Sequence, residues 1–84
     1  MKKYIDTNDQ RYRFYIAECV NDYAIQVLHV ERCEHWALSR QIARQMEIVL
    51  PDKEEWIFYS KSQACLERKL AKLAELNHWV EVES

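Results

Sequence analysis

The feature that most limits how this chain can fold is the complete absence of glycine among its 84 residues. At the average usage of about 7%, roughly six glycines would be expected in a chain of this length. Turns should therefore be built from Asn, Asp and Ser or placed at Pro51, the single proline, because these residue types accept turn conformations. The same absence excludes the glycine-dependent phosphate-binding loops, dinucleotide-binding turns and nucleophile elbows of many enzymes.

The clearest helical pattern starts at Ser60. Ser60 and Gln63 have the spacing of a capping box, in which each side chain hydrogen-bonds to the backbone amide of the other residue. Leucines then recur on one face at helical spacing, with the last at its edge: Leu66, Leu70, Leu73 and Leu76. Asn77 suits the end of the helix, because asparagine tolerates the left-handed conformation that many helix termini adopt.

A short strand is predicted on each side of this helix. Val80 and Val82 alternate with glutamates, which predicts a strand that buries both valines and turns Trp79 outward. Before the helix, Trp56 to Tyr59 is a run of four bulky apolar residues, typical of a strand buried on both faces. The loop from Pro51 to Glu55 carries three carboxylates, which we interpret as a solvated acidic loop.

The N-terminal part of the chain predicts strands. Lys2 to Asp6 is a candidate short edge strand, followed by a cluster of turn-forming residues. Gln10 to Val20 and Tyr23 to Glu31 are rich in aromatic and β-branched residues, which predicts a hairpin with a tight turn at Asn21-Asp22. One face of this hairpin should meet the core: Phe14, Ile16, Val20, Tyr23, Ile25 and Val27. The other face is apolar enough to be covered or to meet a partner: Arg13, Tyr15, Ala17, Cys19, Gln26, Leu28 and Val30.

From Glu34 to about Val49 the apolar spacing becomes helical, and Pro51 ends the segment. The inward stripe would consist of Leu38, Ile42, Met46 and Val49. Another side of the same helix would carry Trp36, Arg40, Ala43 and Glu47. Trp36 and Arg40 have the spacing to stack, and an outward tryptophan beside an arginine is typical of an interface hot spot. The alternative is that Trp36 folds over the end of the sheet.

These patterns predict one compact α+β domain over residues 1–84, in which an N-terminal hairpin is followed by helix, strand, helix and strand. The sheet would be mixed, with four to five strands packed by two helices. No segment approaches the roughly 18 apolar residues of a membrane span, and no signal-peptide pattern follows Met1. We therefore expect a cytoplasmic protein that does not associate with membranes, with its three cysteines reduced.

No residue set supports catalysis or metal binding. Cys33, His35, Cys65 and His78 could in principle supply four zinc ligands, but they lack the paired spacing of structural zinc sites. His35 instead projects onto the inward stripe of the expected helix, as a partly buried histidine. A nucleophilic Cys19 or Cys65 would lack an oxyanion stabiliser. We therefore predict a protein that is not an enzyme and has no metal or cofactor.

The net charge of −2, evenly distributed along the chain, argues against a protein that covers phosphates with a basic face.

We expect a small protein-binding module, an adaptor or inhibitor of bacterial, plasmid or phage regulatory type, for which a homodimer is a compatible state. The residues predicted to contact the partner protein are Arg13, Tyr15, Leu28, Trp36, Arg40, Glu47 and Trp79. The alternative is a single-stranded nucleic-acid-binding protein that stacks bases on the outer face of the aromatic hairpin.

Overall fold

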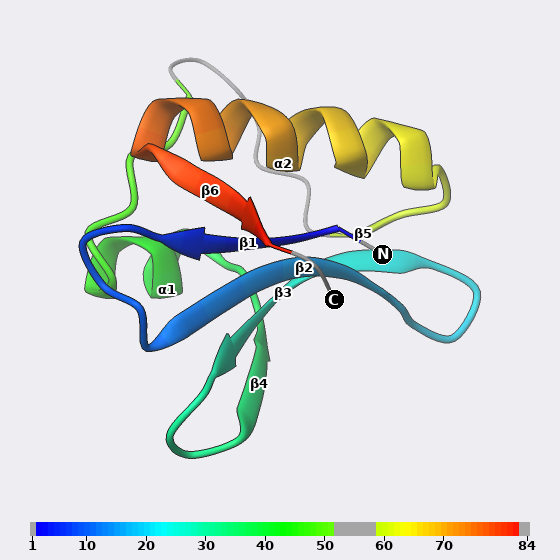
Figure 1. The fold of residues 1–84 in the computed structure, drawn as a ribbon. Helices are drawn as coiled ribbons and strands as arrows, with labels where there is room; N and C mark the ends of the chain where they lie inside the picture. Colours follow the sequence, from blue (N-terminus) through cyan, green and yellow to red (C-terminus); the bar gives the residue numbers. More distant parts are fainter. Residues whose placement is uncertain (1, 52–58, 83–84) are drawn as a thin grey trace.

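The computed structural model describes residues 2–51 and 59–82 and shows an antiparallel sheet with a long helix, α2, along one face (Figure 1). The strands are β1 (Lys3–Asp6), β2 (Tyr12–Glu18), β3 (Tyr23–His29), β4 (Glu34–Ala37), β5 (Tyr59–Ser60) and β6 (Trp79–Val82). The helices are α1 (Arg40–Gln45) and α2 (Gln63–Asn77). The strand order is β4-β3-β2-β1-β6, and β5 pairs with the part of β3 that β4 leaves open.

Every strand pairing in the described residues is antiparallel, so the expectation of a mixed sheet is wrong. The α+β class with two helices is confirmed.

β1 is not an edge strand: Ile5 lies opposite Arg13 of β2 on one side and Val80 of β6 on the other. Lys3 pairs with Val82, which places the first and last strands side by side (Figure 1, blue and red).

The β2–β3 hairpin has the expected tight turn, displaced by one residue. Its loop is Val20-Asn21, closed by Cys19 and Asp22, whose backbone groups hydrogen-bond to each other at 2.7 and 3.3 Å. Asn21 adopts a left-handed φ of 68°, which asparagine tolerates better than most residues. Val20 therefore lies at the tip of the loop, where it is 89% exposed, and its expected place in the core is wrong.

Moving the loop by one residue shifts the register of the hairpin by two. A turn at Asn21-Asp22 predicts that Phe14 lies opposite His29 and Ile16 opposite Val27. In the structure Phe14 pairs with Val27, and Ile16 with Ile25. Because side chains alternate with a period of two, this shift leaves each residue on its predicted face. The burial of these four apolar side chains in the core is confirmed.

The segment Glu34–Ala37 forms β4, where a helix was expected. It pairs with β3, so Trp36 lies opposite Val27, and the turn before it is made at Cys33 with a φ of 55°. Ser39 then caps α1 by accepting a hydrogen bond from the amide of Ile42 at 3.1 Å. Pairing with β3 therefore overrides the helical spacing of this segment, and the helix that remains has only six residues.

The short helix also changes which side chains are inside. Ala43, expected on an outer side, is fully buried, whereas Val49, expected inside, is exposed. α1 ends at Gln45 with Met46 as its C-cap, and Glu47 adopts a left-handed φ of 58°, which allows the amide of Ile48 to reach the carbonyl of Ala43 at 2.8 Å. The predicted inward stripe is confirmed only in part, because Val49 lies beyond this helix end.

α2 begins two residues later than the predicted capping box. Ser62 is its N-cap and accepts a hydrogen bond from the amide of Cys65 at 3.3 Å, while Ser60 lies in β5. The helix ends at Asn77 as expected, but the left-handed residue is His78, with a φ of 59°. The leucine face is confirmed, because three leucines are buried and the fourth is partly exposed: Leu66, Leu70, Leu73 and Leu76.

Non-glycine residues hold all the left-handed positions of the described chain: Asn21, Cys33, Glu47 and His78. The expectation that Asn, Asp, Ser and Pro alone would make the turns is therefore wrong. A left-handed conformation costs an ordinary L-residue roughly 1–2 kcal/mol, because Cβ approaches the following carbonyl oxygen. The surrounding hydrogen bonds and packing must supply this free energy.

The core lies between α2 and the sheet, and Trp79 of β6 is part of it. Its ring stacks on Phe14 with a centroid distance of 3.8 Å and an interplanar angle of 8°, and 6% of the residue is exposed. Val80 is 50% exposed instead, so the prediction that Val80 is buried and Trp79 turns outward is wrong. The large ring gains more from burial than valine does, and this decides the orientation of β6.

Two sequence predictions fall outside the described residues. These are the acidic loop over 52–55 and most of the strand Trp56–Tyr59. Of that strand only Tyr59 is described, and it pairs with Ala24 of β3. None of the helices in the described ranges is long and apolar enough to cross a membrane.

Candidate partner-binding face

Part of the side of the sheet opposite α2 forms a surface, which we call the outer face and define by two rows of residues. Strand register arranges it in two rows: Val82, Lys3, Tyr15, Gln26 and Ala37, then Val80, Ile5, Arg13, Leu28 and His35. All of these residues are half-buried or exposed. The buried side chains of α2 and of the α1 segment join the core on the opposite side. The outer face is therefore a solvent-accessible surface spanning β6, β1, β2, β3 and β4.

Tyr15 is the tyrosine within these two rows and is held by its neighbours. Its hydroxyl hydrogen-bonds with Nδ1 of His35 and lies 3.5 Å from Oε1 of Gln26. The Nζ atom of Lys3 lies 5.3 Å from the centroid of its ring. Partial burial raises the pKa of the Tyr15 hydroxyl. Tyr15 is thus a positioned, neutral ring with a cation beside it.

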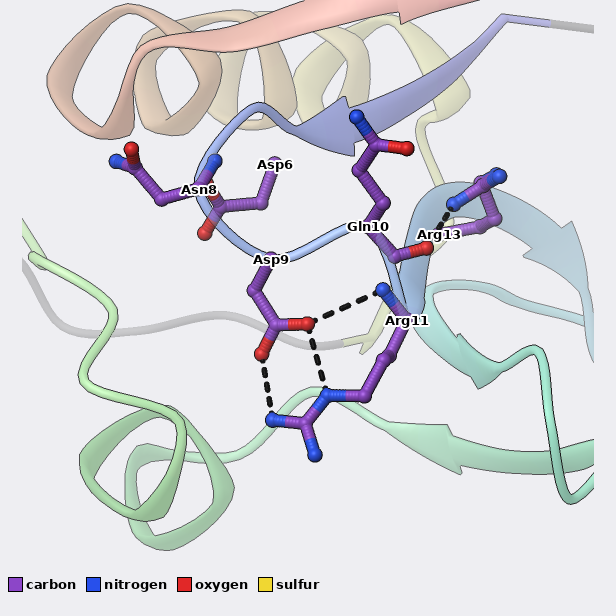
Figure 2. Close-up of polar contacts among 6 residues, drawn as sticks. All are labelled: Asp6, Asn8, Asp9, Gln10, Arg11 and Arg13. Carbon is purple, nitrogen blue, oxygen red and sulfur yellow. Dashed lines mark hydrogen bonds and ion pairs between the residues drawn. The ribbon is translucent and has the colours of Figure 1, made fainter.

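Arg13 is anchored at the turn between β1 and β2 (Figure 2). Its Nη1 donates to the carbonyl oxygen of Gln10 at 2.7 Å and to that of Tyr12 at 3.3 Å. In the sheet it pairs with Ile5 on one side and Leu28 on the other. A fixed positive charge therefore stands between two aliphatic side chains of the outer face.

The same turn is fixed by Asp9 and Arg11 (Figure 2). The Asp9 carboxylate accepts from Nε and Nη2 of Arg11 at 2.9 and 2.8 Å, and from the Arg11 amide at 3.1 Å. The hydrogen bond from the Arg11 side chain lowers the pKa of Asp9 to about 2. The hydrogen bonds between Asp9 and Arg11 thus fix the turn that contains Gln10, whose carbonyl oxygen accepts from Arg13.

Three of the predicted partner-contacting residues lie together on the outer face, namely Arg13, Tyr15 and Leu28. Trp36 does not join them, because it is half-buried on the inner side of β4, edge-to-face with the ring of His29 at 6.1 Å. The expectation of an outward helical Trp36 is wrong. The alternative was that Trp36 folds over the end of the sheet; in the structure Trp36 is instead a residue of the end strand β4, opposite Val27, and packs against the core.

The other predicted contact residues are also separated from the outer face. Arg40 is exposed at the first position of α1, and Glu47 is exposed in the turn that ends it. Trp79 lies in the core. The predicted contact set therefore divides among the outer face, the ends of α1 and the interior.

Sequence reasoning missed the part of the outer face contributed by β1, β4 and β6: Lys3, Ile5, His35, Ala37, Val80 and Val82. His35 is exposed on β4, so the prediction that it is partly buried on the inward stripe of a helix is wrong. Side chains alternate between the two faces of any strand, so a strand over Lys3–Asp6 places Lys3 and Ile5 on the same face. Nothing in the sequence showed that this strand lies between the hairpin and the last strand.

The cysteines Cys19, Cys33 and Cys65 are free, and Cys33 is the exposed one. Across residues 2–51 and 59–82, no group of three or more His, Cys, Asp or Glu side chains could hold a metal ion. The side chains that the outer face presents are apolar, aromatic, amide and cationic.

Comparison with protein-family models, curated proteins and solved structures finds no match to this chain. The description of its class therefore rests on the fold, an antiparallel sheet packed on one side by α2, with α1 beside it.

Proposed function

We propose that this protein is a non-catalytic module that binds another protein through its outer face, as an adaptor or as an inhibitor that occupies its target's surface. The observation that supports this most is the composition of the face. Aliphatic side chains from three strands lie there beside a positioned tyrosine: Ile5, Leu28, Val80 and Val82. Removing such side chains from water contributes about 25 cal/mol per Å² buried, so covering the face would favour association.

Single-stranded nucleic acid is the alternative ligand of this face, but the arrangement favours it less. Proteins that bind single strands without sequence preference stack successive bases on several aromatic rings. The two rows of the outer face contain two rings, Tyr15 and His35, and these hydrogen-bond to each other. The other positions of the two rows carry aliphatic, amide or cationic side chains, which offer no further ring for stacking. The proposal also keeps, as expectations, the cytoplasmic location and the bacterial, plasmid or phage origin.

The experiment is affinity capture from a cell lysate, followed by reconstitution with the purified partner. The outer-face variant is Leu28→Ser/Val80→Ser, which removes two aliphatic contacts. The matched control is Val49→Ser/Leu76→Ser, which alters two exposed or partly exposed apolar residues outside the outer face. Circular dichroism and thermal melting confirm that both variants are folded.

We expect the purified partner to bind the wild type and the control equally and to bind the outer-face variant at least tenfold more weakly. Equal binding to all three proteins would exclude the outer face as the binding surface. Light scattering of the same samples tests for a homodimer, because self-association through this face would be lost in the outer-face variant and kept in the control.

A further inference from the structure

The charged residues of the strands are divided between the two sides of the sheet. The carboxylates of the described strands all occupy positions on the inner side: Asp6, Glu18, Glu34 and Glu81. The lysine and the arginine of these strands, Lys3 and Arg13, both occupy the outer face. In a chain with a net charge of −2, this division gives the outer face the opposite sign from the whole protein.

No ion pair neutralises either outer-face cation within the described part of the chain. The ion pairs found there join Lys2 with Glu81, Arg11 with Asp9, and Arg32 with Glu34. Arg13 donates to neutral carbonyl oxygens, which leave its charge uncompensated. Lys3 lies against the ring of Tyr15, which positions its ammonium group without pairing it with a carboxylate.

The cations are interleaved with aliphatic residues. Lys3 pairs across the sheet with Val82, and Arg13 stands between Ile5 and Leu28. A complementary ligand must place acidic groups next to apolar groups. An extended polypeptide in which carboxylates alternate with apolar side chains has this pattern on a single strand.

We propose that the partner presents an acidic, apolar segment to the outer face, with its carboxylates at Lys3 and Arg13. This inference rests on the proposed function and adds to it the chemistry of the partner. Charge complementarity of this kind accelerates association, excludes basic partners and weakens with salt. Negatively charged nucleic acid would meet the same cations, so it is tested alongside.

The probes are fluorescein-labelled pools of 12-residue peptides of otherwise random sequence. Alternate positions are restricted to Asp and Glu in one pool, to Asn and Gln in a second, and to Lys and Arg in a third. A 15-nucleotide oligothymidylate serves as the nucleic-acid probe. Binding is measured by fluorescence anisotropy at about 50 and 500 mM NaCl, across which electrostatic attraction is strongly screened.

We expect the acidic pool to bind at least tenfold more tightly than the amide pool and to lose this advantage at high salt. The variant Lys3→Gln/Arg13→Gln should bind the acidic pool at least fivefold more weakly. Its control is Arg68→Gln/Lys72→Gln, which removes the same charge from the exposed side of α2 and should bind as the wild type does. Melting curves of both variants exclude unfolding.

Equal binding of the acidic and amide pools, or no binding by any pool, would overturn the acidic-partner inference and leave the capture experiment to decide the proposed function. Tighter binding of the oligonucleotide than of the acidic pool, abolished by Lys3→Gln/Arg13→Gln, would overturn the inference and favour nucleic acid as the ligand. Loss of binding in the α2 control would show that total charge, and not the outer face, governs association.

Discussion

The side-chain amide of Asn77 hydrogen-bonds to both backbone groups of Val49. Its Oδ1 accepts from the Val49 amide at 2.7 Å, and its Nδ2 donates to the Val49 carbonyl oxygen at 2.9 Å. Nδ2 also donates to the carbonyl oxygen of Leu73 at 2.9 Å. One side chain at the end of α2 therefore pairs with the segment after α1 as a neighbouring strand would, and it ties together residues 28 positions apart.

We expect Asn77→Ala to lower the free energy of unfolding by about 0.5–1.5 kcal/mol, because it removes these hydrogen bonds while water can still reach the exposed backbone groups of Val49. Urea denaturation measures the loss, and hydrogen exchange should show faster exchange of the Val49 amide. Asn77→Asp is the informative companion, since it keeps an acceptor for the amide but places a carboxylate against two carbonyl oxygens. Wild-type stability of Asn77→Asp would show that the two Nδ2 hydrogen bonds contribute nothing.

Trp79 combines a stacked ring with an Nε1 group that is buried and has no hydrogen-bond partner among the described residues. We expect Trp79→Ala to cost about 3–5 kcal/mol through the cavity it creates beside Phe14. Trp79→Phe should cost less than about 1.5 kcal/mol, because it keeps an aromatic ring on Phe14 and removes the unpaired donor. Chemical denaturation of both variants decides this, and equal losses would indicate that Nε1 does have a partner.

Glu47 occupies a left-handed position at the end of α1 that glycine adopts without strain. We expect Glu47→Gly to raise the free energy of unfolding by about 0.5–1 kcal/mol, because the relief of strain in the native state exceeds the entropy that glycine adds to the unfolded chain. Glu47→Ala retains Cβ and should bring no such gain. Ala71→Gly, in the interior of α2, should instead cost about 1 kcal/mol. Thermal and urea denaturation compare the stability of the three variants. If Glu47→Gly is no more stable than Glu47→Ala, the left-handed conformation of residue 47 is not strained.

The Asp9 pair predicts a pH dependence of stability. The pKa of Asp9 is lowered from its ordinary value of 3.8 to about 2, chiefly by the Arg11 side chain. Its contribution is therefore fully present above about pH 4 and is lost as the pH falls towards 2, because protonation breaks the pair. Asp9→Asn should have a lower urea midpoint than the wild type at pH 7, and the two midpoints should converge near pH 2. A difference that stays constant with pH would contradict this origin.

The strand and helix content of the chain could be predicted wherever one local signal decides the structure. The leucine face of α2 and the core face of the hairpin are repeated patterns. The predicted faces are therefore correct even though the start of α2 and the hairpin turn were misplaced by one or two residues. The hairpin is the clearer example, since a displaced turn at Val20-Asn21 changed its register and left Phe14 and Ile16 inside.

The errors occurred where two apolar patterns compete. In Trp79-Val80-Glu81-Val82 both alternate sets begin with an apolar residue, and the larger ring is inside, where it stacks on Phe14, a residue distant in the sequence. In the segment from Glu34, helical spacing competes with pairing to β3, which depends on residues distant in the sequence. The four outer-face residues of β1 and β6 could not be predicted for a similar reason, because their position depends on β1 lying between β2 and β6.

The absence of glycine also acts on the unfolded chain. Glycine has the greatest backbone freedom of any residue, so a chain without it has less conformational entropy to lose when it folds. The strained residues at positions such as Cys33 and His78 raise the free energy of the native state, whereas the missing glycines raise that of the unfolded ensemble. For an 84-residue chain with a small core, this restriction of the unfolded ensemble is a source of stability that no native contact displays.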